Sequence, residues 1–268
     1  MIKKFEMVFV VLVYRNYEDL YPFFKSINKT IFDEYKVIII DSFYSQEVSN
    51  QIKSIALENN ADYLSVPNRG YGAGNNAGIK HAMAKYSFEY LIISNPDIEI
   101  TKFNHEILLK KYTCIAPIIA TKTGKMQNPF WAVENGFAEK MIYKGFKSNS
   151  KFFLYLGIGI NKIIRNIFLH HLEKVSGYEK KIYAAHGSFL LISYEFLHST
   201  QFEYDNKMFL FYEEAVLAKV LKDKNQVITF TDEICILHNE DGSMNLANIN
   251  EYKFLKESYV YYYEKYRL

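Results

Sequence analysis

Residues 66–96, VPNRGYGAGNNAGIKHAMAKYSFEYLIISNP, decide the fold. They read as a loop rich in Gly and Asn, an amphipathic helix and a buried strand, LIIS, that ends at Asn95-Pro96-Asp97. Proline cannot continue a hydrogen-bonded ladder, so it marks the end of the strand. An acidic residue at the C-terminal end of a buried strand lies where open α/β sheets bind their ligands. Asp97 is therefore the first candidate for chemistry.

The same alternation of strand and helix precedes this stretch. Residues 7–14, MVFVVLVY, and 36–40, KVIII, predict two buried parallel strands, each followed by a segment with helical spacing. This order is the βαβ signature of a parallel sheet. Asp41 comes directly after the second strand, as Asp97 does after its own. We expect the two acids to converge on one crevice.

The loop Gly70-Tyr71-Gly72-Ala73-Gly74 is superficially similar to a dinucleotide-binding GxGxxG motif. The spacing is GxGxG and the loop does not follow the first strand, so we reject that interpretation. The glycines would let the backbone approach a ligand, with Asn75 or Asn76 capping the following helix. A plain flexible loop is the alternative.

Predicted strands and helices alternate less clearly in the second half of the chain. A short helix is predicted at 103–109, a strand at 113–119, and further strands at 226–230 and 234–237, the last ending at His238. Residues 208–221 become a helix, with Glu213 and Glu214 near its first turn, where acids also stabilise the helix dipole.

The region 141–174 is basic and aromatic, which is typical of an interfacial amphipathic helix. A helical hairpin packed in the core fits the pattern equally well. No uninterrupted apolar run reaches about 18 residues, so no membrane-spanning segment is predicted.

Composition narrows the function classes. The chain of 268 residues is 49% hydrophobic and has a net charge of +2, which fits globular structure and gives no nucleic-acid footprint. Cys114 and Cys235 have no partner motif, so we expect reduced thiols in a cytoplasmic protein.

Several blocks together resemble family 2 glycosyltransferases with the GT-A fold. These blocks, which follow one another in the same order as in the family, are VVLVYRN (10–16), VIIIDS (37–42), PNRGYGAGNNAGI (67–79), LIISNPDIEI (91–100), HGSFLLI (186–192) and FLFYEE (209–214). His238 with Gly242-Ser243 is similar to the late histidine of the family. The set most resembles the bacterial rhamnosyltransferase-like branch that builds capsule, O-antigen and cell-wall polysaccharides.

The resemblance implies an α/β fold with a Rossmann-like, mostly parallel central sheet flanked by helices. Residues 1–120 would form the nucleotide-sugar-binding half. Residues 121–268 would form the half that holds the acceptor and the catalytic base, ending in a helical, aromatic extension. The two halves would make one continuous GT-A domain.

The resemblance also assigns the nucleotide-binding residues. Tyr14 and Asp41 match positions that hold the nucleobase, with Asp41 accepting from its imide N–H. Arg69, Gly70 and Asn76 belong to the loop that lines the nucleotide pocket.

The resemblance assigns the residues of the reaction centre as well. Asn95 and Asp97 stand at the family's DxD position, where Asp97 would bind Mg²⁺ or Mn²⁺ on the donor diphosphate and His238 would complete that site. Glu214 matches the catalytic base, with Glu213 beside it. Asn95 replaces the first Asp of the motif, which leaves fewer charged ligands for the metal ion. Val216 stands where a second Asp is usual, so which glutamate acts as the base stays open.

This assignment predicts an inverting transferase that moves a sugar from a UDP- or dTDP-sugar to a lipid-linked or growing polysaccharide. We expect it in the cytoplasm, at the inner face of the membrane, with residues 141–174 as the contact. Dimerisation through the Tyr-rich terminal helix, 251–268, is a further expectation. The alternative is a non-catalytic nucleotide-binding subunit of a polysaccharide assembly complex. A nucleotidyltransferase is disfavoured, because residues 10–17 hold only Arg15 where a lysine-rich phosphate loop would be needed.

Overall fold

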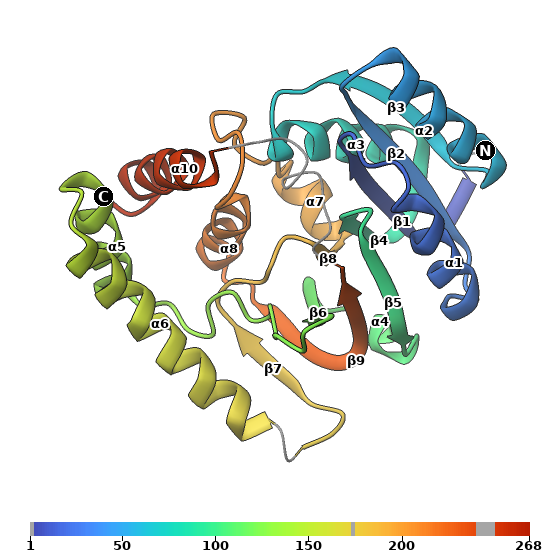
Figure 1. The fold of residues 1–268 in the computed structure, drawn as a ribbon. Coiled ribbons are helices and arrows are strands. Elements are labelled where there is room, and N and C mark those ends of the chain that lie inside the picture. Colours follow the sequence, from blue (N-terminus) through green and yellow to red (C-terminus); the bar gives the residue numbers. More distant parts are fainter. Residues whose placement is uncertain (1–2, 173–174, 240–249) are drawn as a thin grey trace.

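A computed structural model describes residues 3–172, 175–239 and 250–268 (Figure 1). The strands are β1 Lys3–Val13, β2 Tyr35–Phe43, β3 Asp62–Pro67, β4 Tyr86–Ser94, β5 Ile98–Phe103, β6 Cys114–Thr121, β7 Glu179–Ile182, β8 Phe189–Ser193 and β9 Ile228–His238. The helices are α1 Leu20–Thr30, α2 Gln46–Glu58, α3 Tyr71–Lys85, α4 Glu106–Leu109, α5 Gly136–Lys147, α6 Lys151–Leu172, α7 Tyr194–Thr200, α8 Glu213–Asp223 and α10 Glu251–Tyr266.

The described strands form one sheet, in the order β3-β2-β1-β4-β8-β6-β9-β5, with β7 paired to β9. The half built from β1 to β4 is parallel. β8 then runs antiparallel to both β4 and β6, and β6 is parallel to β9. The predicted α/β class, with parallel central strands flanked by helices, is confirmed.

Helices cover both faces of the sheet, as the apolar run in β1 predicts. Phe9 and Val11 face the side of α1 and α2, whereas Val8 and Val10 face the side of α3 and α8. Successive side chains of a strand point to opposite faces, so a strand covered on both sides must be apolar throughout. The C-terminal ends of the parallel strands β1, β2 and β4 therefore share one edge, where polar residues can meet.

Two predicted boundaries in this half are wrong. β2 continues through Asp41 to Phe43, with Asp41 opposite Val13 on β1 and Ser65 on β3. Asp41 therefore lies among the last residues of the strand rather than after it. The helix predicted at 103–109 is present as the short α4, but it begins at Glu106, because Phe103 is the last residue of β5. In both places the pairing with neighbouring strands outweighs the local pattern.

The two late strands predicted at 226–230 and 234–237 are one strand, β9, whose pairing with β6 shifts register after Pro117. β5 pairs antiparallel with β9, and Ile98 lies opposite His238. This register brings Asp97 next to His238 across a long separation in sequence.

The glycine-rich segment is a helix rather than a loop. α3 begins at Tyr71, and Gly70 precedes it with a φ of +101°. A Cβ on Gly74 would lie 2.4 Å from Leu12 Cδ1, and one on Gly78 would lie 2.2 Å from Val10 Cγ1. The glycines thus let α3 pack closely on β1. Asn75 and Asn76 lie inside the helix, so the predicted capping role is wrong.

The basic, aromatic region forms a helical hairpin of α5 and α6, where Gly145 packs against Leu154. Residues 173–174 of this region lie outside the described residues. α6 is long and apolar enough, by length and composition, to cross a membrane, although Lys162 and Arg165 interrupt its apolar run. Length and composition alone therefore do not confirm the predicted absence of a membrane-spanning segment.

α10 packs its tyrosines into the protein. Tyr259 and Tyr262 are fully buried and contact the ring of Tyr212, with centroids 4.6 and 5.9 Å away. This face of the helix belongs to the core, so the dimer predicted through α10 would have to use its other face. Gly242 and Ser243, predicted beside His238, lie outside the described residues.

Candidate active site

Asp97 and His238 form a buried pair at the C-terminal edge of the sheet. Asp97 lies in the turn from β4 to β5, and its Oδ1 is 3.2 Å from His238 Nε2. His238 Nδ1 is 2.7 Å from Gln127 Oε1. With Gln127 Oε1 as the acceptor, Nδ1 carries the ring proton and Nε2 turns its lone pair toward the carboxylate. Two acceptors that face each other need a shared cation, which is either a second ring proton or a metal ion.

His186 adjoins this pair but does not face Asp97 as a partner. Its ring centroid is 5.8 Å from that of His238, and its Nδ1 is 2.9 Å from Ser188 Oγ. Burial, and then the neighbouring His238, lower the pKa of His186 to about 3. The imidazole is therefore neutral near pH 7 and orders the loop before β8.

Tyr71, which no sequence motif singles out, connects three of the blocks that carry the family resemblance. From the first turn of α3, its hydroxyl lies 3.1 Å from Asn95 Oδ1 and donates to the Gly187 carbonyl at 2.8 Å. A Cβ on Gly187 would lie 3.9 Å from both the Tyr71 hydroxyl and Glu214 Oε2. Glu214 and the Asn95–Asp97 turn are thus within reach of one substrate. In the sequence, the one sign that Tyr71 has a role is its position between two glycines at the start of a helix.

Glu213 and Glu214 begin α8 in different environments. Glu213 is 2% exposed and its Oε1 has no hydrogen-bond partner among the described residues, whereas Glu214 is partly exposed. Burial, and then the charge of Glu214, raise the pKa of Glu213 to about 8. Burial raises the pKa of Glu214 to about 7. A carboxylate with a raised pKa is a stronger proton acceptor, as general base catalysis requires.

The backbone before these glutamates is strained. Phe211 and Tyr212 both have left-handed φ values, +73° and +69°, which cost energy in non-glycine residues. The ring of Tyr212 is held by Phe130, at 5.8 Å, and by the tyrosines of α10. The C-terminal helix therefore fixes the turn from which the two carboxylates project.

The predicted nucleobase residues lie at the ends of β1 and β2. Asp41 is buried, and its Oδ2 accepts from Ser49 at 2.5 Å and from Tyr63 at 2.7 Å. Oδ1 is the oxygen left for a ligand. The ring of Tyr14 packs edge-on to Tyr44 at 5.9 Å, and Arg15 lies 4.2 Å over Tyr44. Tyr44 is a further aromatic surface that the sequence analysis missed, although it follows β2 as Tyr14 follows β1.

The predicted pocket loop contains residues with different surroundings. Arg69 is exposed and pairs with no acid in the described ranges, so its guanidinium is free to meet an anion. Asn76 is buried, accepts from the Tyr204 amide at 2.8 Å and donates to the Tyr204 carbonyl. Its amide therefore ties α3 to the segment that leads to α8. A direct contact between Asn76 and a nucleotide stays a prediction.

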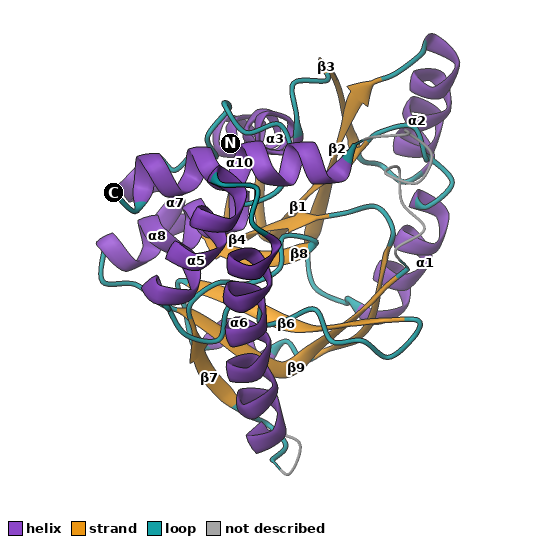
Figure 2. Cartoon of the chain, turned by 60° about the vertical axis from the view of Figure 1, so that its left-hand side comes forward, coloured by secondary structure: helices purple, strands orange, loops and turns teal. Residues whose placement is uncertain are grey.

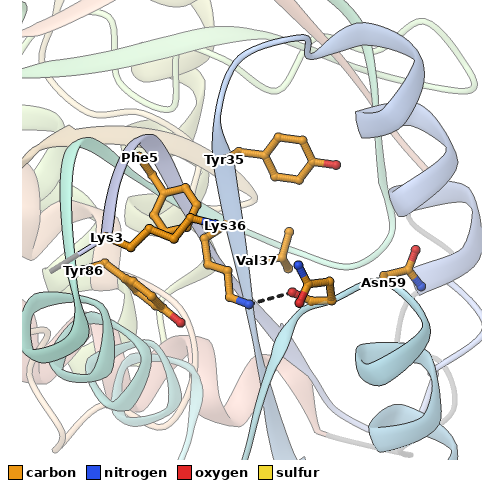
Figure 3. Close-up of a pocket in the computed structure, with 8 residues that line it drawn as sticks. Lys3, Phe5, Tyr35, Lys36, Val37, Asn59 and Tyr86 are labelled. Atoms are coloured by element: carbon orange, nitrogen blue, oxygen red, sulfur yellow. Dashed lines mark hydrogen bonds between the residues drawn. The ribbon is translucent and has the colours of Figure 1, made fainter. Parts of the chain in front are cut away.

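Two features at the opposite end of the sheet lie away from this edge. A cavity of about 340 Å³ is lined by the first residues of β1, β2 and β4, where Lys36 donates to the Asn60 carbonyl (Figure 3). Glu6, Asp33 and His105 could together hold a metal ion, and His105 Nδ1 lies 2.7 Å from Asp33. Ligands of parallel sheets bind at the other, C-terminal ends of the strands.

Residues 8–148 match the model of the family described as glycosyl transferase family 2. No curated protein matches the sequence.

Three solved structures share the fold at low sequence identity. GalNAc-T7 with UDP, GalNAc and Mn²⁺ has a TM-score of 0.61 and 13% identity, over 88% of this chain and 44% of that one. The mannosyltransferase PcManGT from Pyrobaculum calidifontis, in complex with GDP-Man and Mn²⁺, has a TM-score of 0.54 and 9% identity, over 87% and 56%. S. aureus TarS has a TM-score of 0.56 and 12% identity, over 87% and 36%. This chain thus spans only about a third to just over half of each neighbour.

Proposed function

The chain belongs to glycosyl transferase family 2, and on that premise we propose that it transfers a sugar from a nucleoside diphosphate donor to a hydroxyl group, with inversion. The donor is a UDP- or dTDP-sugar of the rhamnose, glucose or galactose type. The acceptor is a lipid-linked or growing capsule or cell-wall polysaccharide, as in the rhamnosyltransferase-like branch. One observation carries the proposal: Tyr71 joins the Asn95–Asp97 turn to the Gly187 loop beside Glu214, at the edge where parallel sheets bind ligands.

The nucleoside would lie against the ends of β1 and β2. Asp41 Oδ1 accepts the imide N–H of uracil or thymine, and Tyr63 and Ser49 hold the carboxylate in place through Oδ2. Tyr14 and Tyr44 offer aromatic faces to the base. The free guanidinium of Arg69 meets negative charge on the donor.

The buried Asp97–His238 pair fits a divalent cation. A carboxylate oxygen and an imidazole nitrogen that face each other at 3.2 Å would both turn toward a metal ion, and Gln127 fixes the ring that presents Nε2. Asn95 supplies a neutral oxygen nearby. When bound, Mg²⁺ or Mn²⁺ neutralises the charge that the leaving diphosphate gains. With a single carboxylate in the pair, we expect the ion to bind mainly together with the donor.

Glu214 is the better placed of the two glutamates to act as the base. It is partly exposed and its Oε2 faces Gly187, whereas Glu213 is enclosed against Gly72 at the start of α3. The Glu214 carboxylate takes the proton of the acceptor hydroxyl, whose oxygen forms the bond to the sugar C1. The C1–O bond to the diphosphate breaks, and the leaving group keeps the electron pair. One base and one displacement give inversion.

A donor screen with base variants tests this function. Wild-type protein, Glu214→Gln and the surface control Glu58→Gln are incubated with UDP- and dTDP-sugars plus Mn²⁺, and slow donor hydrolysis is measured. We expect hydrolysis of one donor class, a loss of about 10²- to 10⁴-fold in Glu214→Gln, and no change in the control. Nucleotide binding without turnover in the wild type would instead support the non-catalytic, nucleotide-binding alternative.

A further inference from the structure

α6 carries an apolar stripe on its outer surface. The stripe consists of Phe152, Leu156, Ile163 and Ile167; Phe152 is 71% and Ile163 61% exposed. The spacings of four, seven and four residues place these side chains within about 60° of the helix circumference. No element in the described part of the chain covers the stripe, and α6 runs along the outside of the molecule (Figure 2).

Basic residues flank this stripe. α6 contains no acidic residue, and Lys151 and Lys162 lie together on one side of the stripe. The neighbouring α5 adds the exposed Lys140 and Lys144, whereas its Lys147 is paired with Glu264 of α10 at 2.7 Å. The one acid of the hairpin, Glu139, is buried against Arg267, at 2.6 Å. An apolar stripe beside lysines is the chemistry that binds anionic lipid headgroups.

The inner surface of α6 is attached to the protein along its length. Asn161 donates to the Phe130 carbonyl at 3.2 Å, and Arg165 donates to the Met126 carbonyl. Near its start, Gly157 packs against Ala138 and Ile142 of α5, and near its end Phe168 packs against Phe230. A helix held on one side in this way can meet lipid only with its outer face, so it cannot cross a membrane while it stays packed on this fold.

We propose that this stripe and its flanking lysines bind the surface of a membrane with anionic headgroups. A second copy of this chain is a poorer occupant, because it would bring two basic faces together. The inference extends the proposed function by placing a lipid-linked acceptor near the site. Arg165 holds Met126, next to Gln127, which contacts His238, so the membrane-binding helix supports the loop beside the proposed metal pair.

Vesicle flotation tests the proposal on the whole protein. Wild type is mixed with vesicles of phosphatidylglycerol and phosphatidylcholine, or of phosphatidylcholine alone, at low and high salt. We expect binding to the anionic vesicles only, and its loss at high salt. The double variant Ile163→Asp with Ile167→Asp should bind at least tenfold more weakly, while Phe32→Asp with Leu57→Asp, two exposed apolar residues elsewhere, should bind as wild type does. Neutralisation of Lys151 and Lys162 to Gln should weaken binding about 25-fold, since each lysine contributes about fivefold.

Several results would overturn the proposal. These are no binding to anionic vesicles, equal binding to neutral ones, unchanged binding in the stripe variant, resistance to alkaline carbonate extraction, or a concentration-dependent dimer that the stripe variant abolishes. Nucleotide binding is measured on the same samples without vesicles. A failure there concerns the proposed function, and it leaves the membrane result to be judged separately.

Discussion

Replacement of Gly70 by Ala should destabilise the protein and displace the catalytic turn. Gly70 has φ +101° and ψ 172°, a region that is almost restricted to glycine and costs other residues about 1–3 kcal/mol. The added Cβ would lie 2.3 Å from the Phe209 carbonyl oxygen, a backbone atom that must move. Overpacking of this kind costs about 1–3 kcal/mol more. Phe209 also accepts the Tyr71 amide at 2.8 Å, and it leads directly to Glu213 and Glu214.

The two costs add to about 2–6 kcal/mol, and the midpoint of about 4 kcal/mol corresponds to a fall in Tm of about 8–16 °C for a chain of this size. Differential scanning fluorimetry measures it, and donor hydrolysis should fall further than the stability loss explains. Gly159→Ala is the control, because a Cβ there meets nothing within 4 Å and alanine favours the helix. A Gly70→Ala protein as stable as wild type would show that the contact between residue 70 and Phe209 does not constrain this turn.

Three other predictions rest on buried charges. The folded-state pKa values of Glu213 and Glu214 are raised above their ordinary 4.5, so the contribution of these two groups to stability is fully present below about pH 4.5 and is lost as pH rises toward 8. Tm should therefore fall across that window and fall less in Glu213→Gln, and an equal fall in the variant would contradict this. Donor hydrolysis, in contrast, should rise with a midpoint near pH 7 as Glu214 loses its proton, and a pH-independent rate would remove Glu214 as the base. Arg267→Met should lower the free energy of unfolding, measured by chemical denaturation, by about 3 kcal/mol, because Glu139 keeps a buried charge without its partner. Lys219→Met removes one partner of a solvent-exposed pair and should cost under about 1 kcal/mol. Equal losses in the two variants would show that burial does not set the cost.

The elements that local patterns predict well are those whose ends carry a chemical signal. The strand that ends before Asn95-Pro96 and the helix that begins near Glu213 lie where the sequence places them. Proline stops a ladder, and acids favour a helix start, so neither signal depends on distant residues.

The features that the sequence did not predict depend on contacts between distant segments. β5 exists because β9 pairs with it, and that pairing sets Asp97 beside His238. Gln127, which orients His238, comes from a loop with no recognisable motif. The glycines of α3 look like loop residues in isolation, and only the closeness of β1 explains them as helix residues.

The proposed metal pair is tested by the Tm shift that UDP or dTDP produces with and without Mn²⁺. At a nucleotide concentration about 100 times its Kd, binding should stabilise the protein by about 2.7 kcal/mol, which corresponds to about 5–10 °C. We predict that this shift needs Mn²⁺ and disappears in Asp97→Asn. It should persist in Asp33→Asn, which alters the other acidic and histidine cluster. A shift of equal size without Mn²⁺, or one unchanged in Asp97→Asn, would contradict the assignment of Asp97 and His238 as the metal pair.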